Sequence, residues 1–342
     1  MLASLGKDPS GKELEKIKGS PNYRDNQFQN PEPTTTLAED ASMVKTLWRF
    51  INKPKSSKPP KPLPSVKTDL TKSISDKPEI VWFGHSSYFI RINNITILVD
   101  PVFSNYAAPF SFMNKSFAGT NIYTVNDMPA IDVLLITHDH YDHLDYETIT
   151  KLRPKVKQVY TSLGVASHLA YWGYDEQDIT ELDWWQSATL AGDMQLIAAP
   201  ARHFSGRSFR RFTTLWSSFI LKTNDYNLYI GGDSGYGNHF KEIGDKFGPF
   251  DIAILENGQY NKAWSQIHEM PEDAVQACID LKAKVLLPVH WAKFDISLHP
   301  WDEPIKRLIE AAKGKGVQVT TPLIGEPVII DGVYPCSEWW KL

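Results

Sequence analysis

The chain has 342 residues, of which 42% are hydrophobic and 12% aromatic, and its formal net charge is -4. This length and composition allow a large buried core, and the charge provides no overall attraction to nucleic acid, so no nucleic-acid partner is expected. No apolar run approaches the roughly eighteen residues needed to cross a bilayer, and the amino terminus lacks the hydrophobic region of a signal peptide. We therefore expect a soluble cytoplasmic protein, in which Cys278 and Cys336 are ordinary thiols.

Residues 1–78 are predicted to form an N-terminal extension that is partly ordered or wraps the core, because they are poor in strand-like runs and rich in Pro, Ser, Lys and Asn. Within this extension, residues 43–51 have the pattern of a short amphipathic helix, and a run containing several lysines and prolines follows it. An apolar face beside lysines is typical of a helix at a membrane surface, which would give peripheral membrane contact. The alternative is a helix docked on the main domain with a solvated linker behind it.

After the extension the sequence changes to short strands joined by tight turns, and residues 79–342 are predicted to form one domain. Asn93-Asn94 is a typical hairpin turn between two of these strands. Two polar residues lie at strand ends. Asp100 is expected to orient a metal-binding imidazole, whereas His85 could make either a structural hydrogen bond or a substrate contact.

Residues 131–136 form an apolar run that is predicted to be a buried strand. The run is followed at once by Thr137-His138-Asp139-His140-Tyr141-Asp142-His143-Leu144-Asp145, at the end of a strand where α/β proteins place ligand sites. Three imidazoles and a carboxylate are the donors that zinc prefers. They would fill the shell of one tetrahedral ion and leave no position for water, so two zinc ions are expected.

Helices and strands alternate through the rest of the domain, which indicates a layered α/β fold with a site along one edge. Three further residues that can bind metal follow predicted strands: His203, Asp233 and His290. Glycines on both sides of Asp233 allow the backbone to approach a ligand closely.

With these residues assembled, the chain resembles the metallo-β-lactamase superfamily, whose His-x-His-x-Asp-His motif is present without departure at residues 138–143. The resemblance covers about residues 79–342 and implies a four-layer αβ/βα sandwich. It also implies the metal ligands, which are His138, His140 and His203 on one zinc, Asp142, His143 and His290 on the other, and Asp233 as the bridge.

Shorter segments resemble the N-acylphosphatidylethanolamine-hydrolysing phospholipase D family. These segments are residues 20–23, 140–145, 200–203, 232–236, 247–251 and 290–291. In that family a histidine shortly before a late helix lies near the substrate, and His268 occupies this place. The sequence departs from the family at residues 256–260, Glu-Asn-Gly-Gln-Tyr, where the lipid-cleaving members carry a less acidic segment.

The resemblance implies a zinc-dependent phosphodiesterase of the phospholipase D type that acts on N-acylphosphatidylethanolamine-like phospholipids. A metal-bridging hydroxide would attack phosphorus, oriented by Asp142 and Asp233, and His268 would bind the substrate or protonate the leaving group. Guanidinium groups suit a phosphodiester. Three arginines after His203 are therefore predicted to bind the substrate: Arg207, Arg210 and Arg211.

Other functions remain open at this point. The same pair of metal ions could attack a carbonyl carbon, which would make the protein a lactonase or another ester-type hydrolase of a small anionic molecule. A nuclease is disfavoured by the net charge of -4. A metal-stabilised binding scaffold without activity would be expected to lack a ligand, and all seven are present. A homodimer is also considered.

Overall fold

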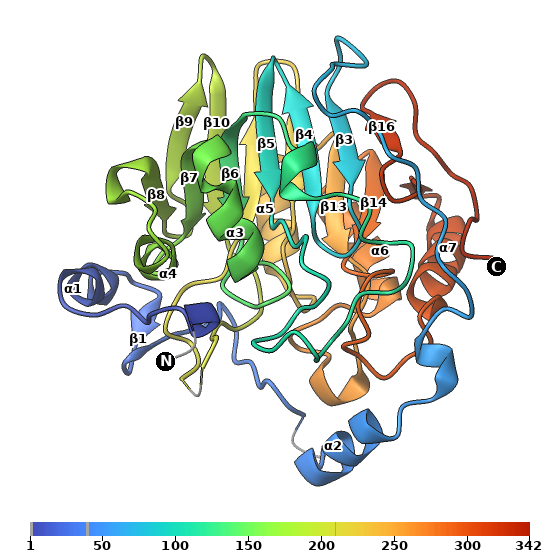
Figure 1. Ribbon diagram of the computed structural model, residues 1–342, viewed down its shortest axis with the longest axis horizontal. Coiled ribbons are helices and arrows are strands. Elements are labelled where there is room, and N and C mark those ends of the chain that lie inside the picture. Colours follow the sequence, from blue (N-terminus) through green and yellow to red (C-terminus); the bar gives the residue numbers. More distant parts are fainter. Residues whose placement is uncertain (1–2, 39–40, 209) are drawn as a thin grey trace.

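The computed structural model describes residues 3–38, 41–208 and 210–342. Its centre consists of two seven-stranded sheets with helices on their outer faces (Figure 1). The first sheet has the strand order β16-β3-β4-β5-β6-β7-β8. Its strands are β3 (Glu79–Trp82), β4 (Tyr88–Ile92), β5 (Ile95–Val99), β6 (Ile131–Ile136), β7 (Val156–Ser162), β8 (Ile179–Leu182) and β16 (Pro327–Ile329).

The second sheet has the order β15-β14-β13-β12-β11-β10-β9. Its strands are β9 (Ser187–Ala191), β10 (Met194–Ala199), β11 (Ser218–Lys222), β12 (Asn227–Ile230), β13 (Ile252–Glu256), β14 (Val285–Val289) and β15 (Gln318–Val319).

The two sheets follow the same plan. In the first sheet β3, β4 and β5 are antiparallel and β5 to β8 are parallel. In the second sheet β9 to β12 are antiparallel and β12 to β15 are parallel. Strands in the middle of a parallel sheet are buried on both faces, which explains why β6 and β14 are nearly continuous apolar runs.

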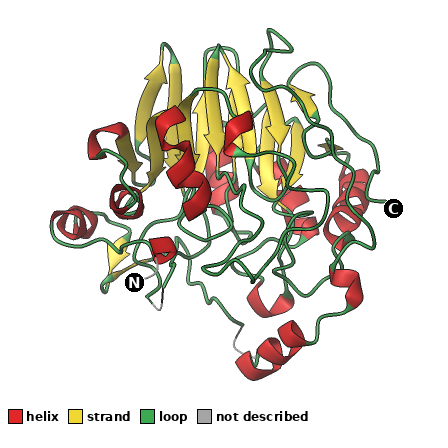
Figure 2. Ribbon diagram, viewed as in Figure 1, coloured by secondary structure: helices red, strands yellow, loops and turns green. Residues whose placement is uncertain are grey.

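Helices cover the outer face of each sheet (Figure 2). They are α3 (Tyr146–Leu152) and α4 (Ala166–Tyr171) on the first sheet, and α5 (His239–Phe247), α6 (Pro271–Asp280) and α7 (Glu303–Lys315) on the second. The largest cluster of buried apolar side chains joins both sheets to α5, α6 and α7, and another lies between the first sheet and its helices. The predicted four-layer αβ/βα sandwich is therefore confirmed.

Local sequence signals explain most element boundaries. Asn93 and Asn94 have φ angles of 49° and 61° and join β4 to β5, as a two-residue hairpin requires. The pattern of residues 163–172 predicts a helix that starts at Leu163, whereas helix α4 begins at Ala166. Leu163 instead donates its amide hydrogen to the Leu182 carbonyl, 3.2 Å away, and so continues the pairing of β7.

Residues 3–38 and 41–78 lie along the surface of the domain and contain α1 (Lys12–Lys18), β1 (Tyr23–Arg24), β2 (Gln27–Phe28) and α2 (Met43–Ile51) (Figure 1). Ile17 and Phe28 are buried in one cluster with Trp216 of the domain. Asn30 forms two hydrogen bonds with the backbone of His203, at 2.8 and 2.9 Å. Among the described residues, no helix is long and apolar enough to cross a membrane.

Candidate metal centre

The segment that follows β6 brings its histidines to the end of the first sheet, where they meet residues from the second sheet. Thr137, the first residue after the strand, is completely buried and donates its amide hydrogen to Asp100, which follows the neighbouring strand β5. This hydrogen bond fixes the start of the segment relative to the sheet. The side chains that come next therefore leave a rigid strand end.

Four side chains form the first cluster of candidate ligands, and their ligand atoms all lie within 4.8 Å of one another: His138, His140, His203 and Asp233. His140 Nδ1 lies 3.0 Å from His138 Nε2 and 3.1 Å from His203 Nε2. Asp233 Oδ2 faces the same point, at 3.8 Å from His138 Nε2 and 3.7 Å from His203 Nε2. Three nitrogens and one oxygen therefore converge as a tetrahedral ion requires.

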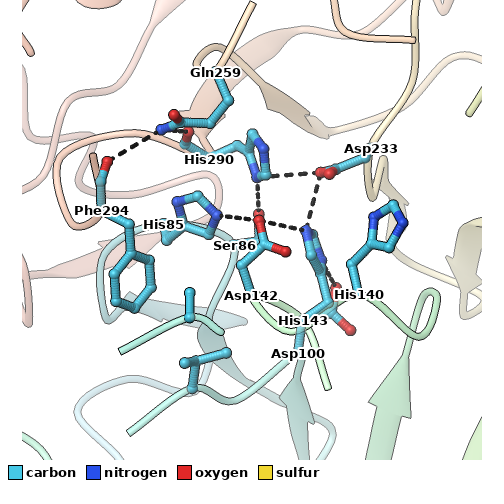
Figure 3. Close-up of polar contacts among 12 residues, drawn as sticks. His85, Ser86, Asp100, His140, Asp142, His143, Asp233, Gln259, His290 and Phe294 are labelled. Carbon is cyan, nitrogen blue, oxygen red and sulfur yellow. Dashed lines mark hydrogen bonds and ion pairs between the residues drawn. The ribbon is translucent and has the colours of Figure 1, made fainter. Parts of the chain in front are cut away.

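The second cluster contains three of the predicted ligands and one further histidine: His85, Asp142, His143 and His290. His85 Nε2 lies 2.8 Å from Asp142 Oδ2, so this histidine belongs to the centre. Asp233 Oδ1 lies 3.2 Å from both His143 Nε2 and His290 Nδ1 (Figure 3). Asp233 thus presents one oxygen to each cluster, which is the arrangement of a bridging carboxylate.

The polar atoms at this centre fit a bound metal. His143 Nε2 and Asp233 Oδ1 are buried, and neither has a hydrogen-bond partner among the described residues. The same is true of His290 Nε2. Such atoms are costly unless a ligand satisfies them, and imidazole nitrogens with carboxylate oxygens are the donors that suit zinc.

The imidazoles are held by hydrogen bonds from the side away from the centre. Asp100 Oδ2 lies 2.7 Å from His143 Nδ1, as predicted for an orienting carboxylate, and it also accepts a hydrogen bond from Thr137 Oγ1 at 2.6 Å. His203 Nδ1 donates to the Ile267 carbonyl, 2.8 Å away. These contacts fix the orientation of each ring before a metal binds.

Most of the charges in the centre match those of metal ligands, which must be neutral imidazoles and ionised carboxylates. His143 is the exception: burial lowers its pKa, but the surrounding carboxylates, chiefly Asp233, raise it well above its usual range. Burial holds the pKa values of three histidines well below their usual range: His138, His203 and His290. Burial opposes ionisation of Asp142 and Asp233, but His143 and the other nearby histidines together outweigh it and hold both carboxyl pKa values well below their usual range.

His268 lies beside the metal centre, at the position that the sequence predicted. Its ring centroid is 5.0 Å from that of His203 and 5.3 Å from that of His290. Its Nδ1 lies 2.7 Å from Glu256 Oε2. Burial lowers the pKa of His268, but the Glu256 carboxylate outweighs burial and raises this pKa above its usual range.

The three arginines that were predicted to bind substrate occupy different environments. Arg207 is buried, and its guanidinium donates to the backbone carbonyls of Ser4, Asp139 and Leu144. All three guanidinium nitrogens thus donate to backbone carbonyls, and they join the histidine motif at residues 138–143 to the N-terminal segment at Ser4. We therefore withdraw Arg207 as a substrate contact.

The other two arginines are exposed. Arg210 lies 3.9 Å from Asp8, on the side of the extension. Arg211 lies over the ring of Phe204, 5.2 Å from its centroid. Phe204 in turn packs against His140 and His203, so Arg211 is connected to the candidate metal ligands through this one ring.

Sequence reasoning missed several residues that hold the site. Asp139 accepts hydrogen bonds from Gly206 N at 2.7 Å and Thr214 Oγ1 at 3.0 Å, which tie the motif to the loop after β10. Its place inside the histidine motif was a signal that could have been used. Asn30 had no such signal, because its contact with His203 joins residues that are 173 positions apart in the chain.

Comparison with known proteins agrees with this geometry. Residues 95–291 match the family described as the beta-lactamase superfamily domain. The chain is 37% identical over 328 residues to an uncharacterized protein of Mycobacterium tuberculosis, covering 94% of this chain and 88% of that protein. It is 30% identical over 269 residues to N-acyl-phosphatidylethanolamine-hydrolyzing phospholipase D 1 of Caenorhabditis elegans, covering 72% of this chain and 74% of the worm protein.

Among solved structures, the fold is similar to that of Igni18, a metallo hydrolase from the hyperthermophilic archaeon Ignicoccus hospitalis. The TM-score is 0.57 at 19% sequence identity, and the match covers 74% of this chain and 97% of the archaeal one. The chain therefore belongs to the metallo-β-lactamase superfamily and is a metal-dependent hydrolase with N-acylphosphatidylethanolamine-hydrolysing phospholipases among its relatives.

Proposed function

We propose that this protein is a dinuclear zinc phosphodiesterase of the phospholipase D type that acts on N-acylphosphatidylethanolamine-like phospholipids. The observation that carries the proposal is the position of Asp233, which presents one oxygen to each of two ligand clusters. Two neighbouring metal sites are the arrangement used for in-line displacement at phosphorus. The identity with the worm phospholipase supports the choice of substrate class.

The residues divide into two sets that would hold the ions. One ion would be held by His138, His140 and His203, and the other by Asp142, His143 and His290, with Asp233 common to both. When bound, zinc would supply a nucleophile from water near neutral pH and stabilise charge on the phosphoryl oxygens. The protein contributes a rigid shell, because Asp100 and the Ile267 carbonyl fix the rings of His143 and His203.

His268 is proposed to act on the leaving oxygen of the substrate. One of its ligand atoms lies within 4.8 Å of those of Asp233 and His290, so a phosphodiester at the centre would be within its reach. A proton given to the leaving oxygen would ease departure of an alcohol. Arg211, exposed above Phe204, is the arginine that we propose to contact the phosphate.

Helix α2 supports contact with a lipid surface. Its outward face carries Val44, Leu47, Trp48 and Ile51, with side chains that are between 62% and 79% exposed. Residues 41–68 contain seven lysines and arginines and no aspartate or glutamate, which suits an anionic membrane. Phe50, on the opposite side, stacks on Trp264 with a centroid distance of 5.9 Å. The helix is thus docked on the domain by one face and offers the other to lipid.

The test combines metal analysis with hydrolysis assays. Elemental analysis of the purified protein should give about two zinc ions per chain. The zinc-loaded protein should hydrolyse bis(p-nitrophenyl) phosphate and N-acylphosphatidylethanolamine, and a chelator should abolish both activities. Two zinc ions with hydrolysis of lactones but of neither phosphodiester would contradict the proposal in favour of a lactonase. Iron in place of zinc would contradict the hydrolytic mechanism.

A further inference from the structure

Glu256 is a buried carboxylate beside the metal centre that none of the ligand clusters contains. It ends strand β13 and is 1% exposed. Its Oε2 lies 2.7 Å from His268 Nδ1, and its Oε1 accepts a hydrogen bond from the amide of Ser234, also at 2.7 Å. Each carboxylate oxygen therefore accepts a hydrogen bond, one from the His268 ring and one from the backbone next to Asp233.

These two hydrogen bonds connect the segment that carries Asp233 to His268, the residue that we propose to act on the leaving oxygen. Ser234 directly follows the bridging Asp233, so Glu256 ties the strand end that carries the bridge to the ring of His268. A hydrogen bond from Nδ1 to the carboxylate leaves Nε2 as the free nitrogen of the ring. The ring itself is held nearly parallel to that of His290, at an interplanar angle of 18°.

We infer that Glu256 is a positioning residue that holds His268 with Nε2 towards the leaving oxygen of the substrate. The inference rests on the proposed hydrolase function. In the step concerned, a water molecule loses one proton to the solvent as its oxygen forms a bond to phosphorus, and the bond from phosphorus to the leaving oxygen breaks. The bonding electrons stay on the leaving oxygen, which takes the proton from His268 Nε2. The imidazole, now neutral, regains a proton from solvent water.

A purely structural role would not require a carboxylate at this position. A neutral amide could still accept the hydrogen bond from Ser234, and a buried carboxylate near Asp233 is costly. The negative charge is useful because it stabilises the protonated ring of His268. When the ring is neutral, the charge keeps the remaining proton on Nδ1, as an acid does beside the histidine of a catalytic triad.

A second buried carboxyl provides a matched control. Glu269 directly follows His268 in the chain, but neither of its carboxyl oxygens has a hydrogen-bond partner in the described part of the protein. Glu269→Gln therefore replaces a carboxyl group by an amide, as Glu256→Gln does, at nearly the same depth and without touching the His268 hydrogen bond.

The experiment compares two leaving groups on the zinc-loaded protein. With N-acylphosphatidylethanolamine in detergent micelles, the leaving group is an alcohol that needs a proton, and Glu256→Gln should lower kcat by about 10- to 100-fold. With bis(p-nitrophenyl) phosphate, the leaving nitrophenolate needs none, and kcat should change by less than about 3-fold. Glu269→Gln should stay within about 2-fold of the wild type on both substrates.

An equal loss on the two substrates would mean that Glu256 has only a structural role, and no loss on either would also overturn the inference. If the wild-type protein cleaves neither phosphodiester, the proposed function fails. Nitrogen NMR of the His268 ring then decides the inference separately. At a pH high enough for the ring to be neutral, the wild type should carry its one remaining ring proton on Nδ1, and Glu256→Gln should change this tautomer signal. An unchanged ring spectrum would overturn the inference.

Discussion

The metal centre and helix α2 depart from the usual distribution of side chains in opposite directions. At the centre, ionisable side chains such as His143 and Asp233 are buried, with polar atoms that lack hydrogen-bond partners among the described residues. On α2, large apolar side chains such as Leu47 and Trp48 are mostly exposed. Globular proteins normally bury large apolar side chains and expose ionisable ones.

The difference indicates what each region binds. An unpaired polar atom in the interior costs free energy until a ligand satisfies it, and the convergent nitrogens and oxygens at the centre suit a cation. A cluster of exposed apolar side chains costs free energy until an apolar surface covers it, and the basic residues around α2 suit anionic lipid. The proposed function accounts for both regions, with metal ions at the centre and a lipid surface against α2.

Among the variants that test this comparison, removal of the proposed shared metal ligand should cause the largest loss of activity. Asp233→Ala should lower kcat/KM by about a thousandfold or more, because zinc contributes several kcal/mol to the transition state. His138→Ala should have a similar effect on activity but remove metal chiefly from one cluster. Elemental analysis and activity assays measure both changes, with circular dichroism to verify the fold. Full activity in an Asp233→Ala protein that retains its metal would contradict the assignment.

Weakening the support of one ligand should have a smaller effect. Asp100→Asn keeps the shape of the side chain but loses the charged partner of His143, and should weaken zinc binding by about 10- to 100-fold. Asp132→Asn is the control, because Asp132 accepts hydrogen bonds from Thr96 between the same two strands, at their opposite end. Competition with a chelator measures the affinity. Equal zinc affinities in the two variants would refute the role of Asp100.

Much of the fold could be predicted because its signals are local. The hairpin at Asn93 and Asn94 and the apolar strand 131–136 depend on neighbouring residues only. The order of strands in the sheets is set by contacts between distant parts of the chain and was not predicted, whereas the four-layer arrangement came from the family resemblance. The start of α4 was misplaced because Leu163 pairs with Leu182, a contact that no local pattern indicates.

The same distinction applies to the candidate site. The ligands in residues 138–143 form a compact motif, whereas the closeness of His85 to Asp142 results from folding alone. Glu256 could be noticed as a departure from related sequences, but its hydrogen bond to His268 could not be inferred. Arg207 shows the converse, since a guanidinium near a ligand histidine suggested phosphate binding and the fold directs it to backbone carbonyls instead.

The exposed face of α2 can be tested with lipid vesicles. Replacing Leu47 and Trp48 together by Glu should weaken binding to anionic vesicles at least about 10-fold, because each buried apolar side chain contributes about 1.5–3 kcal/mol. Hydrolysis of bis(p-nitrophenyl) phosphate should not change. Val333→Glu is the control, because Val333 is an exposed apolar residue outside α2 and the change adds the same type of charge. Unchanged sedimentation of the double variant would leave α2 as a helix docked on the domain only.

Glu269 provides the most specific test, with the smallest expected effect. It is a buried acid, and neither a metal ion nor a lipid surface would offset the cost of burying it. Burial, reinforced by Glu256, raises the pKa of its carboxyl well above the usual range, so the folded protein keeps this group protonated. In the unfolded chain the same group loses its proton near pH 4.3. The folded state therefore binds the extra proton above that pH, and Glu269 makes the protein less stable as the pH rises.

Glu269→Gln removes this titration while keeping the shape of the protonated acid. The variant should exceed the wild type in free energy of unfolding by about 1 kcal/mol or more at pH 8, and the difference should shrink towards zero below about pH 4. Urea unfolding of the two proteins over a pH series, at equal zinc concentration, measures it. A difference that stays constant with pH would mean that the buried carboxyl is ionised and has a partner, so that the interior beside His268 tolerates a negative charge as the metal centre does.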